Sequence, residues 1–336
     1  MKNRFFAVKT AVAVFVLLAA FCTSVAFGAQ SLSAADMRSA FTDSSSFFHI
    51  ILFSLRLPRS ILALFTGALL ASSGACFQLF FRNALAEPGI IGISSGATLG
   101  AVIAQTAGVS AVLFGAVAPV NMLAFVGAIA AGAVVTLISG KAGGRSGVTL
   151  LLCGTALGTL YASVSSVILL TKSRELHGIY TWILGSFNGR GWTEVRFIAL
   201  PAALSFILML ICASRLDIMT GGEQPAMSLG LEVAHLRILV LVSGSLAVSA
   251  AVCAGGTIQF VGLIAPHIVR KVYGEIHTKA VRLIPLSALF GAILLLLSDT
   301  AARLVIAPSE LPAGLITSLL GAPFFISLIF TGEKRR

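Results

Sequence analysis

Long runs of apolar residues, separated by short polar stretches, dominate this sequence. A helix needs about 20 mostly apolar residues to cross the hydrocarbon core of a bilayer. Ten stretches are candidates for such helices. They run approximately over 5–27, 50–80, 90–107, 111–138, 148–170, 194–213, 236–254, 258–270, 281–306 and 311–330. The pattern predicts an all-α integral membrane protein in which residues 1–336 form one transmembrane domain of ten helices.

The first apolar stretch has two interpretations. Lys2 and Arg4 precede it and small residues fill 26–29, as in a cleavable signal peptide. The apolar run of such a signal is typically about 7–15 residues long. Because the stretch 5–27 is longer, we expect a retained helix, with cleavage of residues 1–28 as the alternative.

Two of the predicted spans are short and interrupted. The span 90–107 follows Pro88-Gly89, and the span 258–270 contains Pro266. Each is the second helix of a set of four. Paired, broken helices in matching positions are typical of transporters built from an inverted repeat. We therefore predict two inverted-repeat-like halves, 50–170 and 236–330. The alternative is a pair of re-entrant packing elements without functional meaning.

The composition agrees with a membrane protein. Only 10% of the residues are charged, 57% are hydrophobic and the mean hydropathy is +1.01, whereas a soluble domain is about 25% charged. The net charge of +11 is spread over short loops, which argues against a nucleic-acid-binding face. With ten spans and an inner N-terminus, about two thirds of the 23 lysines and arginines lie in inner loops. This bias predicts that both termini are cytoplasmic.

One cytoplasmic loop, 214–237, is long and of mixed character. Pro225 suits the first turn of a short helix, and Gly230 suits the end of that helix. Ala226 and Leu229 would give this helix a small apolar patch outside the bilayer. The segment is either a docking element for a partner or an ordinary surface loop.

Motifs for chemistry within the chain are missing. The nearest fragment to a phosphate-binding loop, Ser139-Gly140-Lys141-Ala142, lacks the leading glycine and the hydroxyl residue after lysine. No His, Cys, Asp and Glu cluster has metal-ligand spacing. We therefore expect no catalytic residue, no metal site and no cofactor in this chain. If ATP drives the protein, another chain binds it.

Three arginines lie at the outer ends of two long helices, one in each half: Arg56, Arg59 and Arg303. Asp299 and Arg303 are four residues apart and could pair along one helix face. Snorkelling of the arginines to water is the alternative. In a two-fold dimer these arginines would surround one outer mouth and attract a partner that carries carboxylates.

Several blocks of the sequence resemble the FecCD-type permeases, the membrane subunits of ATP-binding-cassette (ABC) importers for ferric siderophores, haem and vitamin B12. The resemblance covers essentially the whole chain in the right order. The blocks are Leu57-Pro58-Arg59, Gly67-Ala68, Arg82–Ala97, Gly256–Arg270 and Glu310–Phe324. One departure is Ala84, where these permeases usually have proline.

The resemblance implies a homodimer with its translocation path on the two-fold axis, in a bacterial or archaeal cytoplasmic membrane. Two ATPase subunits, which bind ATP and Mg, would dock inside, and an extracytoplasmic substrate-binding protein would dock outside. It also implies three groups of site residues. They are Arg56, Arg59 and Arg303 for binding-protein docking; Gly222, Glu223, Ala226, Leu229 and Gly230 for ATPase coupling; and Asn83, Leu85, Gly147 and Val148 for the cytoplasmic gate.

The predicted function is thus the permease subunit of an importer for a ferric-siderophore-type iron chelate, haem or vitamin B12. A secondary transporter driven by an ion gradient is the alternative, because broken helix pairs also occur in that class. Such a carrier needs ionisable residues at depth, and Asp299 is the one candidate that the sequence offers. An intramembrane enzyme would need paired polar groups at depth, which we do not find. Which of the three cargoes is carried, and whether the binding protein is periplasmic or lipid-anchored, stay open.

Overall fold

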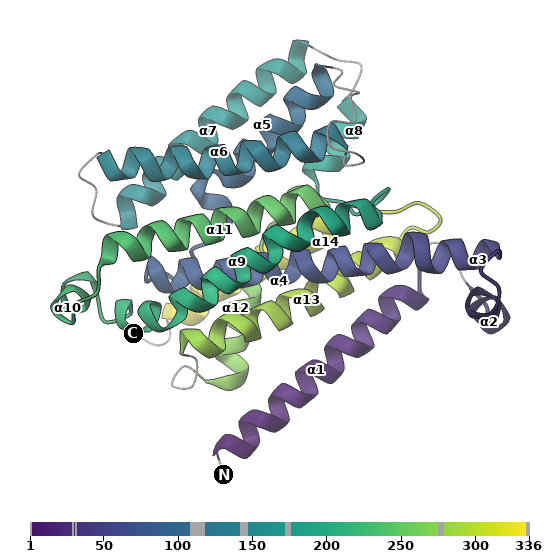
Figure 1. The fold of residues 1–336 in the computed structure, drawn as a ribbon, viewed down its shortest axis with the longest axis horizontal. Coiled ribbons are helices and arrows are strands. Elements are labelled where there is room, and N and C mark those ends of the chain that lie inside the picture. The colour runs from purple at the N-terminus through teal and green to yellow at the C-terminus, as the bar shows by residue number, and fades with distance from the viewer. Residues whose placement is uncertain are drawn as a thin grey trace.

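The fold is built from helices that lie roughly along one long direction (Figure 1). The structure is a computed structural model and describes residues 2–28, 30, 32–107, 118–141, 147–171, 176–274 and 279–333. Within these ranges it contains helices and no strand. The described residues therefore agree with the all-α fold that the apolar runs predict.

The helices follow the predicted stretches closely. Their bounds are α1 Lys2–Ala26, α2 Ala34–Thr42, α3 Phe47–His49, the π-helix η1 Ile50–Arg56, α4 Leu57–Phe80, the 3-10 helix η2 Pro88–Ile91, α5 Ile93–Thr106, α6 Pro119–Lys141, α7 Gly147–Thr171, α8 Leu176–Ile183, α9 Trp192–Met219, α10 Glu223–Ser228, α11 Val233–Gly255, α12 Val261–Tyr273, α13 Ala280–Leu304 and α14 Ala313–Glu333. The beginning of the predicted span 111–138, residues 111–117, lies outside the described residues.

Seven of these helices are long and apolar enough to cross a membrane, as counted over the described residues. The three predicted spans without this property correspond to α5, α12 and α14. Helices α5 and α12 have 14 and 13 residues, which is shorter than a bilayer requires. The apolar part of α14 described here ends at Ser327. The sequence did not predict α2, α3 and α8.

The two predicted sets of four helices, α4–α7 and α11–α14, do not form separate bundles. Helices of one set pack between helices of the other. Helix α4, the first of one set, packs along α13, the third of the other set. Likewise α11 packs along α6. Figure 1 shows α4 and α11 in the centre of the molecule. The core is consequently made by helices that are far apart in the sequence.

Small residues allow these helices to approach closely. A Cβ atom added to Gly67 of α4 would lie 2.3 Å from the carbonyl oxygen of Gly291 in α13, and one added to Gly100 of α5 would lie 2.1 Å from that of Leu123 in α6. Both distances are too short for any side chain, so glycine is required at these contacts. Gly96, one turn earlier in α5, also meets α6, because an added Cβ atom would lie 2.4 Å from the Cβ atom of Ala131.

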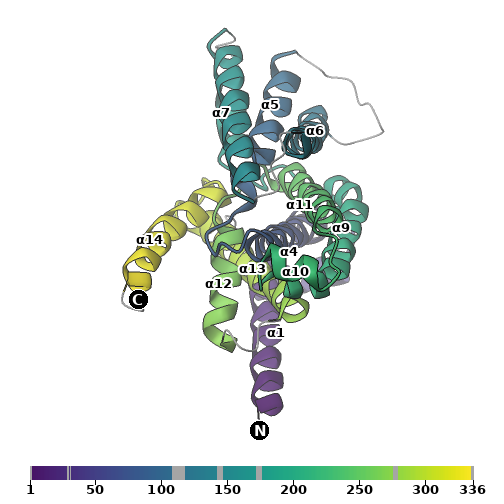
Figure 2. The same cartoon turned by 90° about the vertical axis from the view of Figure 1, so that its left-hand side faces the viewer.

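Helix α1 lies at the periphery, along one side of α13 (Figures 1 and 2). Most of its middle is exposed, as Phe15 at 71% and Leu18 at 59% illustrate. Its C-terminal end, by contrast, reaches the beginning of α4 and the end of α13. That end of the molecule also carries α2 and α3, and α10 lies at the opposite end (Figure 1).

Candidate functional site

The three arginines from the sequence come together at one end of the molecule, with two carboxylates. Arg56 and Arg59 lie at the beginning of α4, Arg303 and Asp299 in the last turns of α13, and Glu310 in the segment that leads to α14. We call these five residues the arginine cluster. The hydrogen bonds of each arginine decide what the cluster can do.

Arg59 forms two ion pairs. Its Nη2 atom lies 2.9 Å from Oδ1 of Asp299, and its Nη1 atom lies 2.6 Å from Oε2 of Glu310. Its Nε donates to both oxygens of Asp299. Asp299 is fully buried and also lies 3.1 Å from Nε of Arg303. The pairing of Asp299 with Arg303 that the spacing of four predicted is confirmed.

The other two arginines bind the C-terminal end of α1. Arg303 donates to the carbonyl oxygens of Ser24 and Phe27 at 2.9 and 2.8 Å and to the Ser24 hydroxyl. Arg56 donates to the carbonyl oxygens of Ala26, at 2.5 Å, and Gln30. The Ser24 and Ala26 carbonyls lie in the last turn of α1 and those of Phe27 and Gln30 follow it, where carbonyl groups lack partners within the helix. The arginines therefore satisfy the end of α1 and pin it to α4 and α13.

All three arginines are buried, with exposures of 6% for Arg56, 8% for Arg59 and 2% for Arg303. The sequence predicted cations on an open outer surface, whereas the structure turns their guanidinium groups inward. The physical reason is that each group finds enough acceptors inside the protein to replace water. The two carboxylates of the cluster differ in exposure. The side chain of Glu310 is 21% exposed, whereas that of Asp299 is fully buried.

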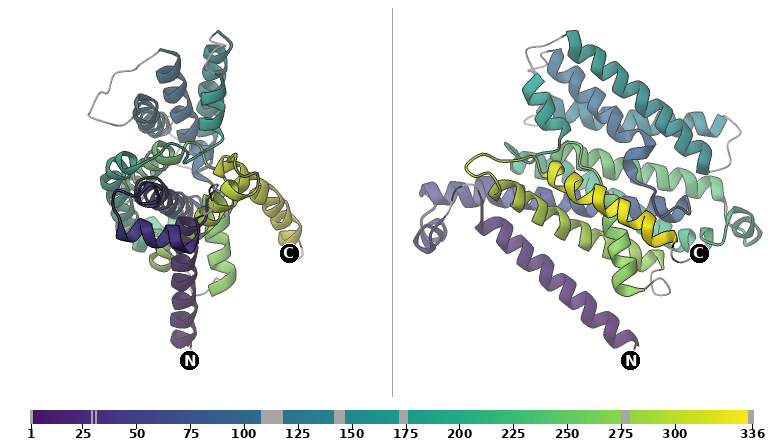
Figure 3. Two further views of the ribbon diagram at one scale, coloured as in Figure 1. Left: turned by 90° about the vertical axis from the view of Figure 1, so that its right-hand side faces the viewer. Right: turned by 180° about the vertical axis from the view of Figure 1, so that it is seen from behind.

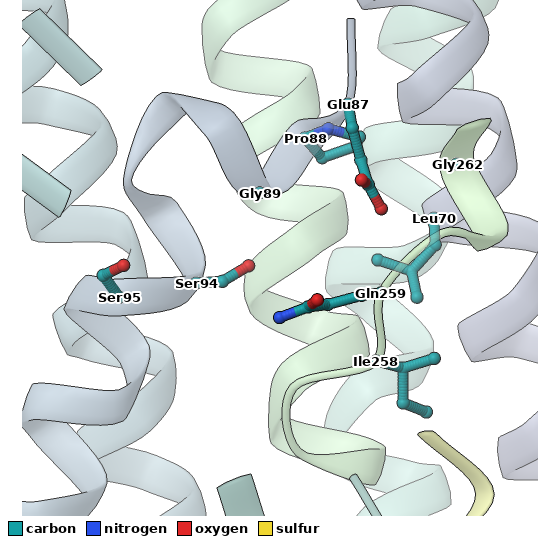
Figure 4. A pocket seen from close by; sticks show the side chains of 9 residues that line it. All are labelled: Leu70, Glu87, Pro88, Gly89, Ser94, Ser95, Ile258, Gln259 and Gly262. Carbon is teal, nitrogen blue, oxygen red and sulfur yellow. The ribbon is translucent and has the colours of Figure 1, made fainter. Parts of the chain in front are cut away.

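A second polar region is a cavity of about 250 Å³ between the N-terminal ends of the two short helices. Glu87 and Ser94 contribute from the entrance of α5, and Gln259 contributes from the entrance of α12. Figure 4 shows the polar ends of these three side chains directed to the same space. The two short helices α5 and α12 thus begin at one polar cavity.

Glu87 links the segment before α5 to the beginning of α12 at this cavity. Its carboxylate accepts the backbone N–H of Phe260, the residue that caps α12. Phe260 has a φ of 68°, which is unusual for a residue with a side chain. Burial raises the pKa of Glu87 above its usual value, and the hydrogen bond from Phe260 lowers it in part. Glu87 therefore helps to cap the N-terminal end of α12, a helix that is distant in the sequence. The sequence offered only a polar turn as a signal for it.

The gate residues predicted from the resemblance lie in two elements. Asn83 and Leu85 belong to the turn after α4, in which the Asn83 side chain accepts the Leu85 N–H at 2.9 Å. Gly147 and Val148 begin α7, and their exposure lies outside what the structure describes. The segment η2, just after that turn, packs on α7.

The predicted coupling segment forms the short helix α10, followed by Gly230 with a φ of 82°. Glu223 lies 3.7 Å from Nη2 of Arg237, which ties α10 to α11. The predicted apolar patch is wrong in one residue. Ala226 is fully buried, and the exposed apolar side chains are Met227 at 54% and Leu229 at 75%. The reason is that Ala226 lies on the face of α10 that is turned to the protein.

Known proteins resemble the chain over nearly its whole length. The model of the FecCD transport family matches residues 16–331. The cobalamin import permease BtuC of Halobacterium salinarum is 40% identical over 85% of this chain and 75% of its own length. The hemin transport permease HmuU of Yersinia pestis is 35% identical over 93% and 92%. A solved structure of a metal-chelate type ABC transporter in an inward-facing conformation has a TM-score of 0.83, with 29% identity over 98% of this chain and all of the other.

Proposed function

The chain belongs to the FecCD transport family, and we propose that it is the membrane-spanning permease subunit of an ATP-driven importer. The observation that carries this function is the family match over residues 16–331, together with the likeness of the whole fold to a metal-chelate ABC transporter. The protein performs conformational rather than chemical work, and ATP hydrolysis with its Mg belongs to a separate subunit.

The cargo is a compact metal chelate. Relatives are named for ferric citrate, hemin and vitamin B12, and our first choice is a ferric-siderophore-type iron chelate, with haem and vitamin B12 as the other candidates. These ligands share a metal that is enclosed by an organic framework. The cavity beside Glu87 and Gln259 offers polar groups to such a framework.

The permease works as a homodimer with its path on the two-fold axis. Helix α7 supports this arrangement, because it exposes a stripe of hydroxyl residues along one face: Thr155, Thr159, Ser163 and Ser166. Each hydroxyl donates to a carbonyl of its own helix. Such a stripe fits a water-filled path or a second protein surface better than lipid. Helices α7 and α14 lie on the same side of the molecule (Figures 2 and 3).

Two ATPase subunits bind at the end that carries α10. The exposed Met227 and Leu229 give this short helix an apolar surface, and the contact between Glu223 and Arg237 gives it a firm link to α11. ATP-driven movement of the ATPases would be transmitted through that link. The gate at Asn83, Leu85, Gly147 and Val148 lies toward the same cytoplasmic end.

A substrate-binding protein docks at the opposite, extracytoplasmic end, on the arginine cluster. The cluster has three cations and two carboxylates, so one positive charge remains for an acidic partner. The lysine and arginine bias of the loops supports cytoplasmic termini in a bacterial or archaeal cytoplasmic membrane. The ten spans and two inverted halves belong to the same proposal, and the exchanged packing of α4 on α13 and α11 on α6 supports it.

An ion-gradient-driven carrier receives no support from these observations. The deep acid that such a carrier would use is Asp299, and this residue is fully buried between Arg59 and Arg303. Both carboxylate oxygens of Asp299 already contact Arg59 or Arg303, so the group is not available to bind a transported cation.

Affinity purification from native membranes in a mild detergent, followed by mass spectrometry, tests the function. We expect one ATPase subunit per permease and an extracytoplasmic binding protein. Uptake into proteoliposomes that contain the purified complex then distinguishes ferric chelates, haem and cobalamin. Uptake that continues when the ATPase is catalytically inactive would refute the proposal.

A further inference from the structure

Each guanidinium group of the arginine cluster already donates hydrogen bonds to acceptors within the protein. Arg59 is engaged by Asp299 and Glu310, Arg303 by Asp299 and α1, and Arg56 by carbonyls at the end of α1. A guanidinium group gains affinity for a carboxylate through direct, charge-assisted hydrogen bonds. A carboxylate of a partner that docks here therefore competes with the acceptors already in place.

The acceptors differ in how easily they can leave. Asp299 is fully buried and contacts both Arg59 and Arg303. The carbonyl groups belong to the backbone at the end of α1 and move only with that helix. Glu310 touches Arg59 through one oxygen, at 2.6 Å, and is partly exposed. The segment just before it, 304–309, is exposed at every residue.

From this comparison we propose that Glu310 is an internal substitute for the carboxylate of the docking partner, and that docking exchanges one for the other on Arg59. This inference rests on the proposed function, because the partner is the acidic substrate-binding protein. Exchange leaves the number of ion pairs on Arg59 unchanged, so the buried guanidinium is never left without a partner. Before docking, Glu310 keeps the positive charge of Arg59 covered.

Exchange of the two carboxylates would also transmit docking to other parts of the permease. Glu310 is followed by Leu311, whose N–H donates to the Ala302 carbonyl of α13 at 2.9 Å. Two residues later α14 begins, and its Gly314 N–H donates to the Gly185 carbonyl at 3.0 Å. Displacement of Glu310 frees the segment that holds the entrance of α14 to these neighbours. The partner thereby acts on a helix that lies on the side proposed for the path.

The test measures the affinity of the soluble binding protein, identified by the purification above and expressed alone, for the permease complex in detergent. Glu310→Gln removes the charge, and Glu310→Asp keeps the charge but shortens the reach to Arg59. We expect both variants to bind about fivefold more tightly than the wild type at low ionic strength, the upper range for a partly exposed ion pair. Asp43→Asn is the matched control, because the exposed Asp43 carboxylate binds Ser45 and contributes one negative charge near the same end.

The outcomes separate the two proposals. If the wild type itself does not bind the binding protein, the proposed docking function fails. If it binds and both Glu310 variants bind with unchanged or weaker affinity, the exchange is refuted. If Asp43→Asn tightens binding as much as Glu310→Gln while Glu310→Asp changes nothing, a general electrostatic field acts and the exchange is again refuted. Equal elution profiles and melting temperatures of the variants establish that they are folded.

Discussion

Helix α1 should remain part of the mature protein, held at its C-terminal end by the arginine cluster. If residues 1–28 were removed, Arg303 would lose its bonds to Ser24 and Phe27, and Arg56 would lose its bonds to Ala26. A buried cation that loses its acceptors is strongly destabilising. We therefore predict that the protein isolated from native membranes has an intact mass that includes residues 1–28.

The strength of this attachment can be measured after the chain is cut. A protease site that replaces the exposed residues 43–45 separates α1 and α2 from the rest. We expect the cut fragment to stay bound. Arg303→Met removes three hydrogen bonds to α1, and the loss of a buried charged contact costs about 3–5 kcal/mol. Because about 1.4 kcal/mol is a factor of ten, the affinity of the fragment for the rest of the protein should fall by a factor of about 100 or more.

Size-exclusion chromatography of the cut protein in detergent, followed by quantification of the fragment, is the assay. Arg196→Met is the control, since this exposed arginine donates to the Trp192 carbonyl of its own helix. Equal retention in the wild type and in Arg303→Met would refute the role of the cluster. An intact mass that lacks about 28 residues, in a complex that is still folded, would refute retention itself.

Three further predictions concern other parts of the fold. Glu87→Ala should lower the free energy of unfolding by about 1 kcal/mol, as the loss of a helix cap does. Glu87→Gln should retain most of that stability, because the amide oxygen still accepts the hydrogen bond. The melting temperatures of the two variants test this prediction. Gly67→Ala should prevent close packing of α4 on α13 and lower the melting temperature, while Gly221→Ala, with no atom nearer than 3.6 Å to the added Cβ, should not. Leu229→Asp should abolish copurification of the ATPase from a folded permease, and Gln224→Ala on the same helix should preserve it.

Most of the helices could be predicted because one property, the length of an apolar run, decides whether a segment can satisfy its backbone in lipid. The same rule fails for α5 and α12, which are helical but too short to span. Their apolar runs include the irregular turns before them. A sum of hydropathy does not distinguish a helix from a turn that is buried among other helices.

In the arginine cluster, the sequence indicated the three arginines and Asp299 but not their environment. The spacing of four between Asp299 and Arg303 indicated their pairing, because both lie on one helix. Nothing local indicated that Arg59 would meet Glu310, which is 251 positions away. The exposed face of α10 was also misjudged, since a helix of six residues is too short for its pattern to define an inner side.

The same limitation explains why the arginines were expected at the surface. A sequence shows where cations lie along the chain but not which carbonyl groups need donors. The end of α1 has unpaired carbonyls, as every helix does, and these lie against the ends of α4 and α13 only after the tertiary structure has formed. Arg56 and Arg303 are therefore structural donors as well as candidates for docking. Because the arginines are buried, the partly exposed Glu310 is the group of the cluster that a docking partner would meet first.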